Sequence, residues 1–72
     1  MTVDEAIQLL YASEINAEVN WFWDAGFTVR VGDRLNGFKT AVVGVPFEHL
    51  ADTLVCEAIK YYPNSDLAKR AT

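Results

Sequence analysis

Residues 18–31 read EVNWFWDAGFTVRV and decide the fold, because two arms of alternating apolar and polar residues flank a turn signal. Every second residue of the first arm is apolar, as in a strand with one buried face: Ala17, Val19, Trp21 and Trp23. The segment 24–26, Asp-Ala-Gly, is typical of a three-residue hairpin loop in which the glycine takes the left-handed conformation. The predicted cross-strand pairs are Trp23 with Phe27, Trp21 with Val29, and Val19 with Val31. Both tryptophans are therefore expected in the core. The alternative, an exposed aromatic platform for a ligand, would need the reversed register and would bury Glu18, Asn20 and Arg30 against the helices.

A second hairpin follows, because Asn36-Gly37 is the strongest short turn signal in the chain. It predicts a third antiparallel strand at 38–43. A two-residue turn places one half of this strand on the tryptophan face: Phe38, Thr40 and Val42. The other half then lies on the opposite face: Lys39, Ala41 and Val43. A longer loop reverses this assignment.

Helix signals bracket the hairpins. Thr2 and Glu5 form a capping-box pattern, and an apolar stripe follows it. Pro46 suits the first turn of a second helix, and Pro63 ends its apolar stripe. Leu67 is the expected anchor of a last short turn, which Asn64 or Ser65 caps. The expected elements are a helix at 3–14, strands at 17–23, 27–32 and 38–43, a helix at 47–62 and a C-terminal turn at 66–70.

These elements predict one small domain spanning residues 1–72. Each helix carries one apolar stripe, and the tryptophan face of the sheet is the surface that matches the two stripes in size. The predicted fold is a two-layer α+β sandwich of order α-β-β-β-α, in which a three-stranded antiparallel meander has both helices on one face. The 51% hydrophobic content is sufficient for such a core.

The net charge of −4 is unevenly distributed: residues 1–24 carry −5, residues 25–45 carry +2 and the remainder carries −1. An acidic balance argues against general attraction to nucleic acid or to an anionic membrane. No apolar run approaches the roughly 18 residues of a membrane span, and the N-terminus lacks the pattern of a secretory signal. A cytoplasmic location is expected.

The sequence predicts no catalytic, metal-binding or cofactor-binding residues, and hence a non-enzymatic protein. Cys56 is the single cysteine and His49 the single histidine, which excludes an intramolecular disulfide and a Cys/His zinc cage. On a helix, these two residues lie about 10 Å apart along the axis, too far for proton transfer. A solvated helix face is predicted from the polar residues around them: His49, Asp52, Thr53, Cys56 and Lys60.

The candidate functional surface is the outer face of the sheet, which mixes basic and apolar side chains. Its predicted interface residues are Phe22, Arg30, Arg34, Lys39, Ala41 and Val43. A three-stranded sheet also leaves two edges unpaired, and small chains gain stability by association. We expect a homodimer contact, or a contact with another protein. A simple solvated face and weak anion or nucleic-acid binding through Arg30, Arg34 and Lys39 are the alternatives.

The element order resembles the double-stranded-RNA-binding domain. However, the first helix here is acidic, the first hairpin loop has no phosphate-binding group, and the last helix opens PFEH without lysine. No functional residue is carried over from that family.

Four features of the sequence resemble those of small bacterial proteins that have no assigned activity. They are the acidic capped first helix, WFWDAGF at 21–27, the turn between Gly32-Asp33 and Asn36-Gly37-Phe38, and YYPNSD at 61–66. This resemblance implies the fold alone.

Overall fold

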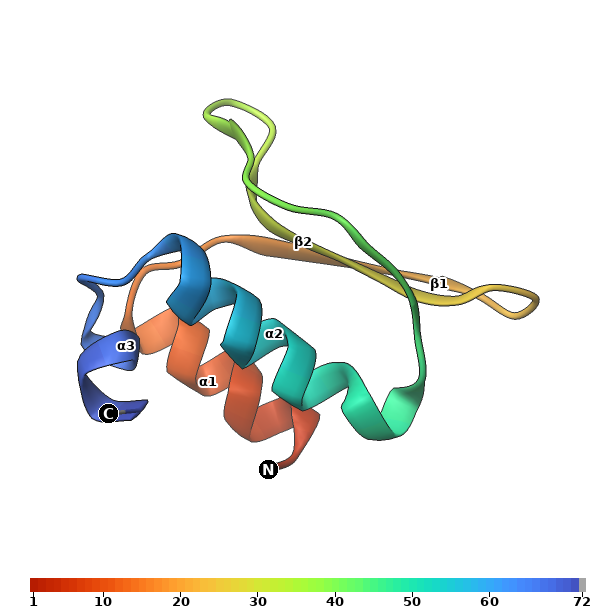
Figure 1. The fold of residues 1–72 in the computed structure, drawn as a ribbon, viewed down its shortest axis with the longest axis horizontal. Helices are drawn as coiled ribbons and strands as arrows, with labels where there is room; N and C mark the ends of the chain where they lie inside the picture. Colours follow the sequence, from red (N-terminus) through yellow and green to blue (C-terminus); the bar gives the residue numbers. More distant parts are fainter. Residues whose placement is uncertain (72) are drawn as a thin grey trace.

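A computed structural model describes residues 1–71 and confirms the predicted α+β architecture. The elements are α1 (Val3–Ala12), β1 (Ala17–Phe22), β2 (Gly26–Asp33), β3 (Gly37–Phe38), β4 (Val42–Val45), α2 (Phe47–Tyr61) and α3 (Asp66–Ala71). Strand β2 is central, with β1 on one side and both β3 and β4 on the other, all antiparallel. The helices cover one face of this sheet (Figure 1).

The predicted capping box opens α1. The Glu5 amide donates to the Thr2 hydroxyl, and the Thr2 amide donates to the Glu5 carboxylate, 3.1 and 3.0 Å apart. Hydrogen bonds from the Thr2 amide and hydroxyl hold the pKa of Glu5 below its ordinary value of 4.5. The helix ends at Ala12 because Glu14 adopts a positive φ of 56°, which turns the chain toward β1.

The third strand is split, and the prediction of a continuous strand at 38–43 is wrong. Asp33 pairs with Gly37, so the turn is longer than two residues, and Phe38 lies opposite Gly32 on the outer face. From Phe38 to Val42 the chain takes four steps where β2 takes three, from Gly32 to Val29, so Val42 returns to the helix side. One extra residue in a paired segment exchanges the two faces. Neither predicted assignment of faces, the one for a two-residue turn or its reverse for a longer loop, therefore holds along the whole segment 38–43.

The core is aliphatic, and the prediction of buried tryptophans is wrong. Its buried apolar residues include Ala6, Leu10, Val29, Val31, Val45, Leu50, Leu54, Ala58 and Leu67. In contrast, Trp21 is 59% and Trp23 is 86% exposed.

Three features explain this exposure. The hairpin register is displaced by two residues, so that Trp21 faces Phe27 and Val19 faces Val29. The turn begins earlier than expected, with the Ala25 amide donating to the Phe22 carbonyl at 3.1 Å, and this places Trp23 in the turn. The hairpin also runs past the ends of the helices (Figure 1).

Two serines anchor the short helix α3. The Ser65 hydroxyl accepts from the Ala68 amide, and the Ser13 hydroxyl, 54 residues away in sequence, accepts from the Leu67 amide at 2.9 Å. Leu67 is buried, as predicted for the anchor of this turn. The end of α1 and the start of α3 are thereby held together.

Candidate protein-interaction surface

Several large apolar side chains of α1, β1 and the start of α2 are exposed. We call this surface the apolar flank: Ile7 and Tyr11 of α1, Val19 and Trp21 of β1, and Phe47 of α2. Their exposed fractions range from 41% for Val19 to 84% for Tyr11. Large apolar side chains in such number at one place are unusual on the surface of a monomer.

The packing of α1 explains two of the five flank residues. This helix packs mainly against α2 and buries Ala6 and Leu10 there. Ile7 and Tyr11 are one turn apart and lie on a neighbouring strip of the helix that α2 does not reach. The apolar stripe of α1 is therefore wider than the surface that covers it.

Aromatic contacts connect Trp21 with Phe47, two further residues of the flank. The ring centroids of Trp21 and Phe27 are 4.7 Å apart, and those of Phe27 and Phe47 are 6.1 Å apart. Both pairs are tilted, at separations that are favourable for aromatic rings. Phe27 thus joins the uncovered part of the hairpin to the start of α2.

A hollow of about 330 Å³ opens between α1 and β1, and we call it the α1–β1 hollow. It is lined mainly by apolar side chains: Ile7, Leu10, Tyr11, Ile15, Asn16, Ala17, Val19 and Leu54. Three members of the apolar flank form its rim. The hollow can accept an apolar group from a partner.

Strand β1 is an edge strand beside this hollow. Among residues 1–71 it pairs with β2 alone, so its other side presents backbone amides and carbonyls. An unpaired edge of this kind is a template for another strand.

The six residues predicted for the interface lie on several different segments. Phe22 and Val43 are 58% and 71% exposed, and Lys39 and Ala41 are also exposed. Arg30 is half-buried, with its guanidinium carbon 5.6 Å from the ring centroid of Phe38. The strand pairing places Phe22 and Arg30 on the outer face, whereas Arg34 lies in the turn after β2, and Lys39 and Ala41 lie between β3 and β4.

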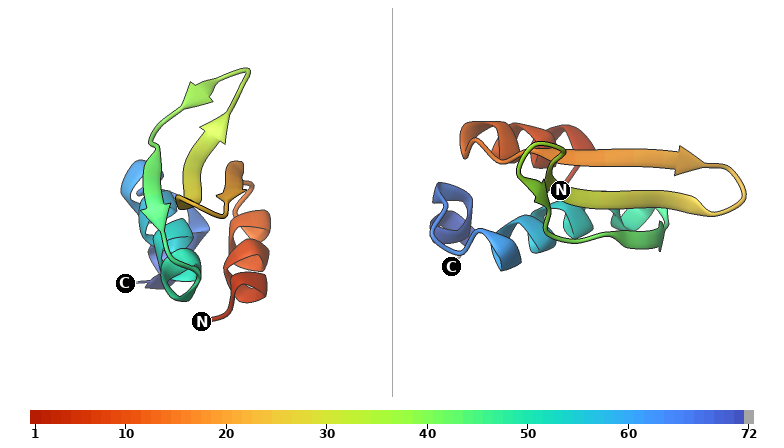
Figure 2. Two further views of the ribbon diagram at one scale, coloured as in Figure 1. Left: turned by 90° about the vertical axis from the view of Figure 1, so that its right-hand side faces the viewer. Right: turned by 90° about the horizontal axis from the view of Figure 1, so that it is seen from above.

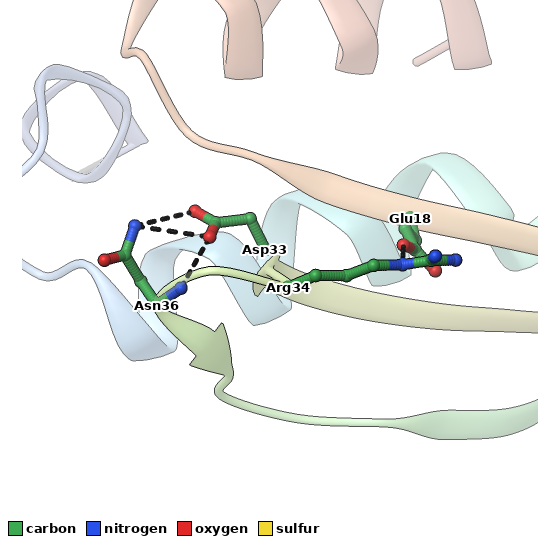
Figure 3. Close-up of polar contacts among 4 residues, drawn as sticks. All are labelled: Glu18, Asp33, Arg34 and Asn36. Atoms are coloured by element: carbon green, nitrogen blue, oxygen red, sulfur yellow. Dashed lines mark hydrogen bonds and ion pairs between the residues drawn. The ribbon is translucent and has the colours of Figure 1, made fainter.

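Charge on the outer face is partly neutralised. Arg34 Nε lies 3.1 Å from Glu18 Oε2, as Figure 3 shows, although the strand register places Glu18 opposite Arg30. Arg34 is 83% exposed, so this is a weak surface ion pair, and anion or nucleic-acid binding stays an alternative prediction.

Asp33 organises the second turn. Its carboxylate accepts hydrogen bonds from the Asn36 amide at 2.7 Å, from the Asn36 side chain, and from Asn16 Nδ2 at 3.0 Å; the Asn36 contacts are drawn in Figure 3. These donors, with the Asn36 backbone first, hold the pKa of Asp33 below its ordinary value of 3.8. The turn after β2 is thereby tied to the chain entering β1.

We expect acid to loosen this turn. Because the pKa of Asp33 is lower in the folded than in the unfolded chain, its stabilising effect is complete above pH 3.8 and disappears as the pH falls through the folded value. A carboxyl NMR titration should give a midpoint below 3.8 for Asp33, and Asn36→Ala should raise that midpoint. A midpoint at or above 3.8 in the parent protein would contradict this assignment.

The polar face of α2 lies where it was predicted. His49, Asp52, Thr53, Cys56 and Lys60 line one shallow surface groove together with Val42 and Glu57. Cys56 is an exposed free thiol. Among the described residues, no group of three or more His, Cys, Asp and Glu side chains could hold a metal ion, and no helix could span a membrane.

No protein-family model, curated protein or solved structure matches this chain. The site therefore has to be judged on its own geometry. The apolar flank is the part that the sequence pattern missed, because the alternation that marks Val19 and Trp21 as apolar also assigned them to the core.

Proposed function

We propose that this protein is a non-enzymatic protein-interaction module that self-associates through the β1 edge and the apolar flank. The observation that carries this proposal is the position of Trp21. This side chain is 59% exposed on β1, an edge strand whose outer side is unpaired, and it is continuous with other exposed apolar side chains. Aromatic side chains beside an open edge offer both apolar contact and backbone hydrogen bonds to a partner.

The size of the flank supports an interface. If an aromatic side chain offers roughly 200 Å², the exposed parts of Tyr11, Trp21 and Phe47 present about 400 Å². This is an unfavourable amount to leave in water, at about 25 cal/mol per Å². A domain of this size also has a small core, so association would contribute to its stability.

Sedimentation velocity tests this proposal. Between about 1 and about 300 micromolar, the weight-average mass should rise from one copy toward two, because association follows mass action. The shift should persist in high salt, since the contact is apolar. A strict monomer over the whole range would reject the proposal.

A further inference from the structure

The apolar flank contains two shapes that complement each other, at opposite ends of β1. The α1–β1 hollow lies at the start of the strand, where Ala17 and Val19 form part of its wall. Trp21 lies near the end of the strand and belongs to the same face. The hollow holds several times the roughly 30 Å³ that one water occupies in the liquid, which makes it the size of a large side chain.

We propose that a second copy of this chain fills the hollow: two β1 strands pair antiparallel about a twofold axis at Val19, and Trp21 of each copy enters the α1–β1 hollow of the other. This inference rests on the self-association proposed above and specifies its geometry. An antiparallel contact between identical strands is self-complementary, because it brings the start of each strand to the end of the other.

The register follows from which residues come to face one another. With the axis at Val19, Trp21 of one copy lies opposite Ala17 of the other, beside the hollow. Glu18 then faces Asn20 of the other copy, a pair in which the amide can donate to the carboxylate.

Registers shifted by one residue, with the axis at Glu18 or at Asn20, make fewer favourable contacts between the two copies. An axis at Glu18 sets two carboxylates opposite each other, which is destabilising. An axis at Asn20 places Trp21 opposite Val19 of the other copy, one step outside the hollow, and sets Phe22 against Glu18. The Val19 register alone combines a filled hollow with compatible polar pairs.

The helices leave room for this contact. Seen from above, α1 lies alongside the first part of β1 and the hairpin extends past it (Figure 2). In an antiparallel pair, α1 of each copy therefore meets the uncovered end of the other hairpin. The two α1 helices lie at opposite ends of the shared strand pair and do not compete for the same space.

The flank supplies part of the area that a stable dimer needs. A standard interface takes about 800 Å² from each partner, and the exposed parts of Tyr11 and Trp21 supply about a third of this. Ile7, Val19 and the backbone edge of β1 extend the contact. No charged side chain belongs to the flank, in keeping with the depletion of charge at interface centres.

A matched pair of substitutions tests the role of Trp21. Trp21 and Phe22 are adjacent, 59% and 58% exposed, and lie on opposite faces of β1. Trp21→Ala should raise the dimer dissociation constant at least about tenfold, as for an anchor residue, whereas Phe22→Ala should change it by less than about threefold. Circular dichroism establishes that both variants are folded.

Cysteine cross-linking tests the register in a Cys56→Ser background. In the proposed dimer, Val19 faces Val19 of the other copy with Cβ atoms about 5 Å apart, close enough for a disulfide after a small adjustment. The Val19→Cys variant should therefore form linked dimers on mild oxidation. The Asn20→Cys variant, whose thiols are offset along the strands, should form few.

The outcomes separate this inference from the proposed function. A dimer that links through the Asn20→Cys variant instead, or that Trp21→Ala and Phe22→Ala weaken equally, overturns the inference and leaves self-association in place. A parent protein that remains monomeric overturns both, and would leave the flank to a different partner. A dimer that links through Val19→Cys and depends on Trp21 supports the proposed geometry.

Discussion

Replacing Gly32 with alanine is expected to destabilise the domain by about 3–5 kcal/mol. Gly32 has a φ of 115°, which L-residues rarely adopt, and a Cβ there would lie 2.6 Å from the Gly37 carbonyl oxygen and 3.1 Å from Phe38 Cα. Both are backbone atoms and cannot rotate away. The Gly32 amide also donates to the Asn16 carbonyl at 2.7 Å, so the clash falls where β1, β2 and β3 meet.

Gly37 provides the matched control. Its φ of 86° is also positive, but a Cβ at this position would have no atom within 4 Å. Gly37→Ala should therefore cost about 1–2 kcal/mol, from the backbone conformation alone. The difference between the variants measures the clash, and equal effects would show that β3 moves aside freely.

Chemical denaturation followed by circular dichroism is the appropriate measurement for these variants. Trp21 and Trp23 are already exposed in the folded chain, so tryptophan emission reports unfolding poorly. Total protein concentration must be kept constant, because self-association adds to the apparent stability.

Replacing Leu54 with alanine is expected to cost about 3–4 kcal/mol. Leu54 is 1% exposed on α2 and is one of the three largest fully buried side chains, with Val29 and Val31. Its truncation removes apolar contacts and leaves a cavity that this small core can only partly close. A domain of this length has a total stability of roughly 4–10 kcal/mol, so the variant should be partly unfolded at 37 °C.

Cys56→Ala is the control for Leu54. It changes an exposed residue half a turn further along the same helix and should alter the free energy of unfolding by less than about 0.5 kcal/mol. If Leu54→Ala cost less than about 1 kcal/mol, the packing around α2 would be looser than the structure shows.

Local signals in the sequence predicted most of the fold. These signals act within a few residues of the chain, so their effects can be read directly from the sequence. They are the capping box of Thr2 and Glu5, the prolines that bracket α2, and the glycines of the two turns. The sidedness of the first hairpin was also correct. The predicted and observed registers differ by two residues, and a shift of two leaves every side chain on the same face.

The candidate site depended on information that these signals do not contain. The predicted surface was the outer face around Phe22 and Arg30, and it stays a prediction. The flank opposite it combines the stripe of α1 with one face of β1, and both patterns were assigned to the core because apolar residues are usually buried. The alternation of apolar and polar residues identifies which side chains share a face. It does not show how far the helices extend over that face.

The sequence by itself determined the element order, the two hairpins and the apolar face of each element, because these depend on neighbouring residues. Only the tertiary structure decided the register of β1 against β2, the break between β3 and β4, and the exposure of Trp21. Those features depend on the length of the helices relative to the hairpin and on hydrogen bonds between distant segments. The aromatic hairpin that resembled a core consequently leaves Trp21, Phe22 and Trp23 each more than half exposed.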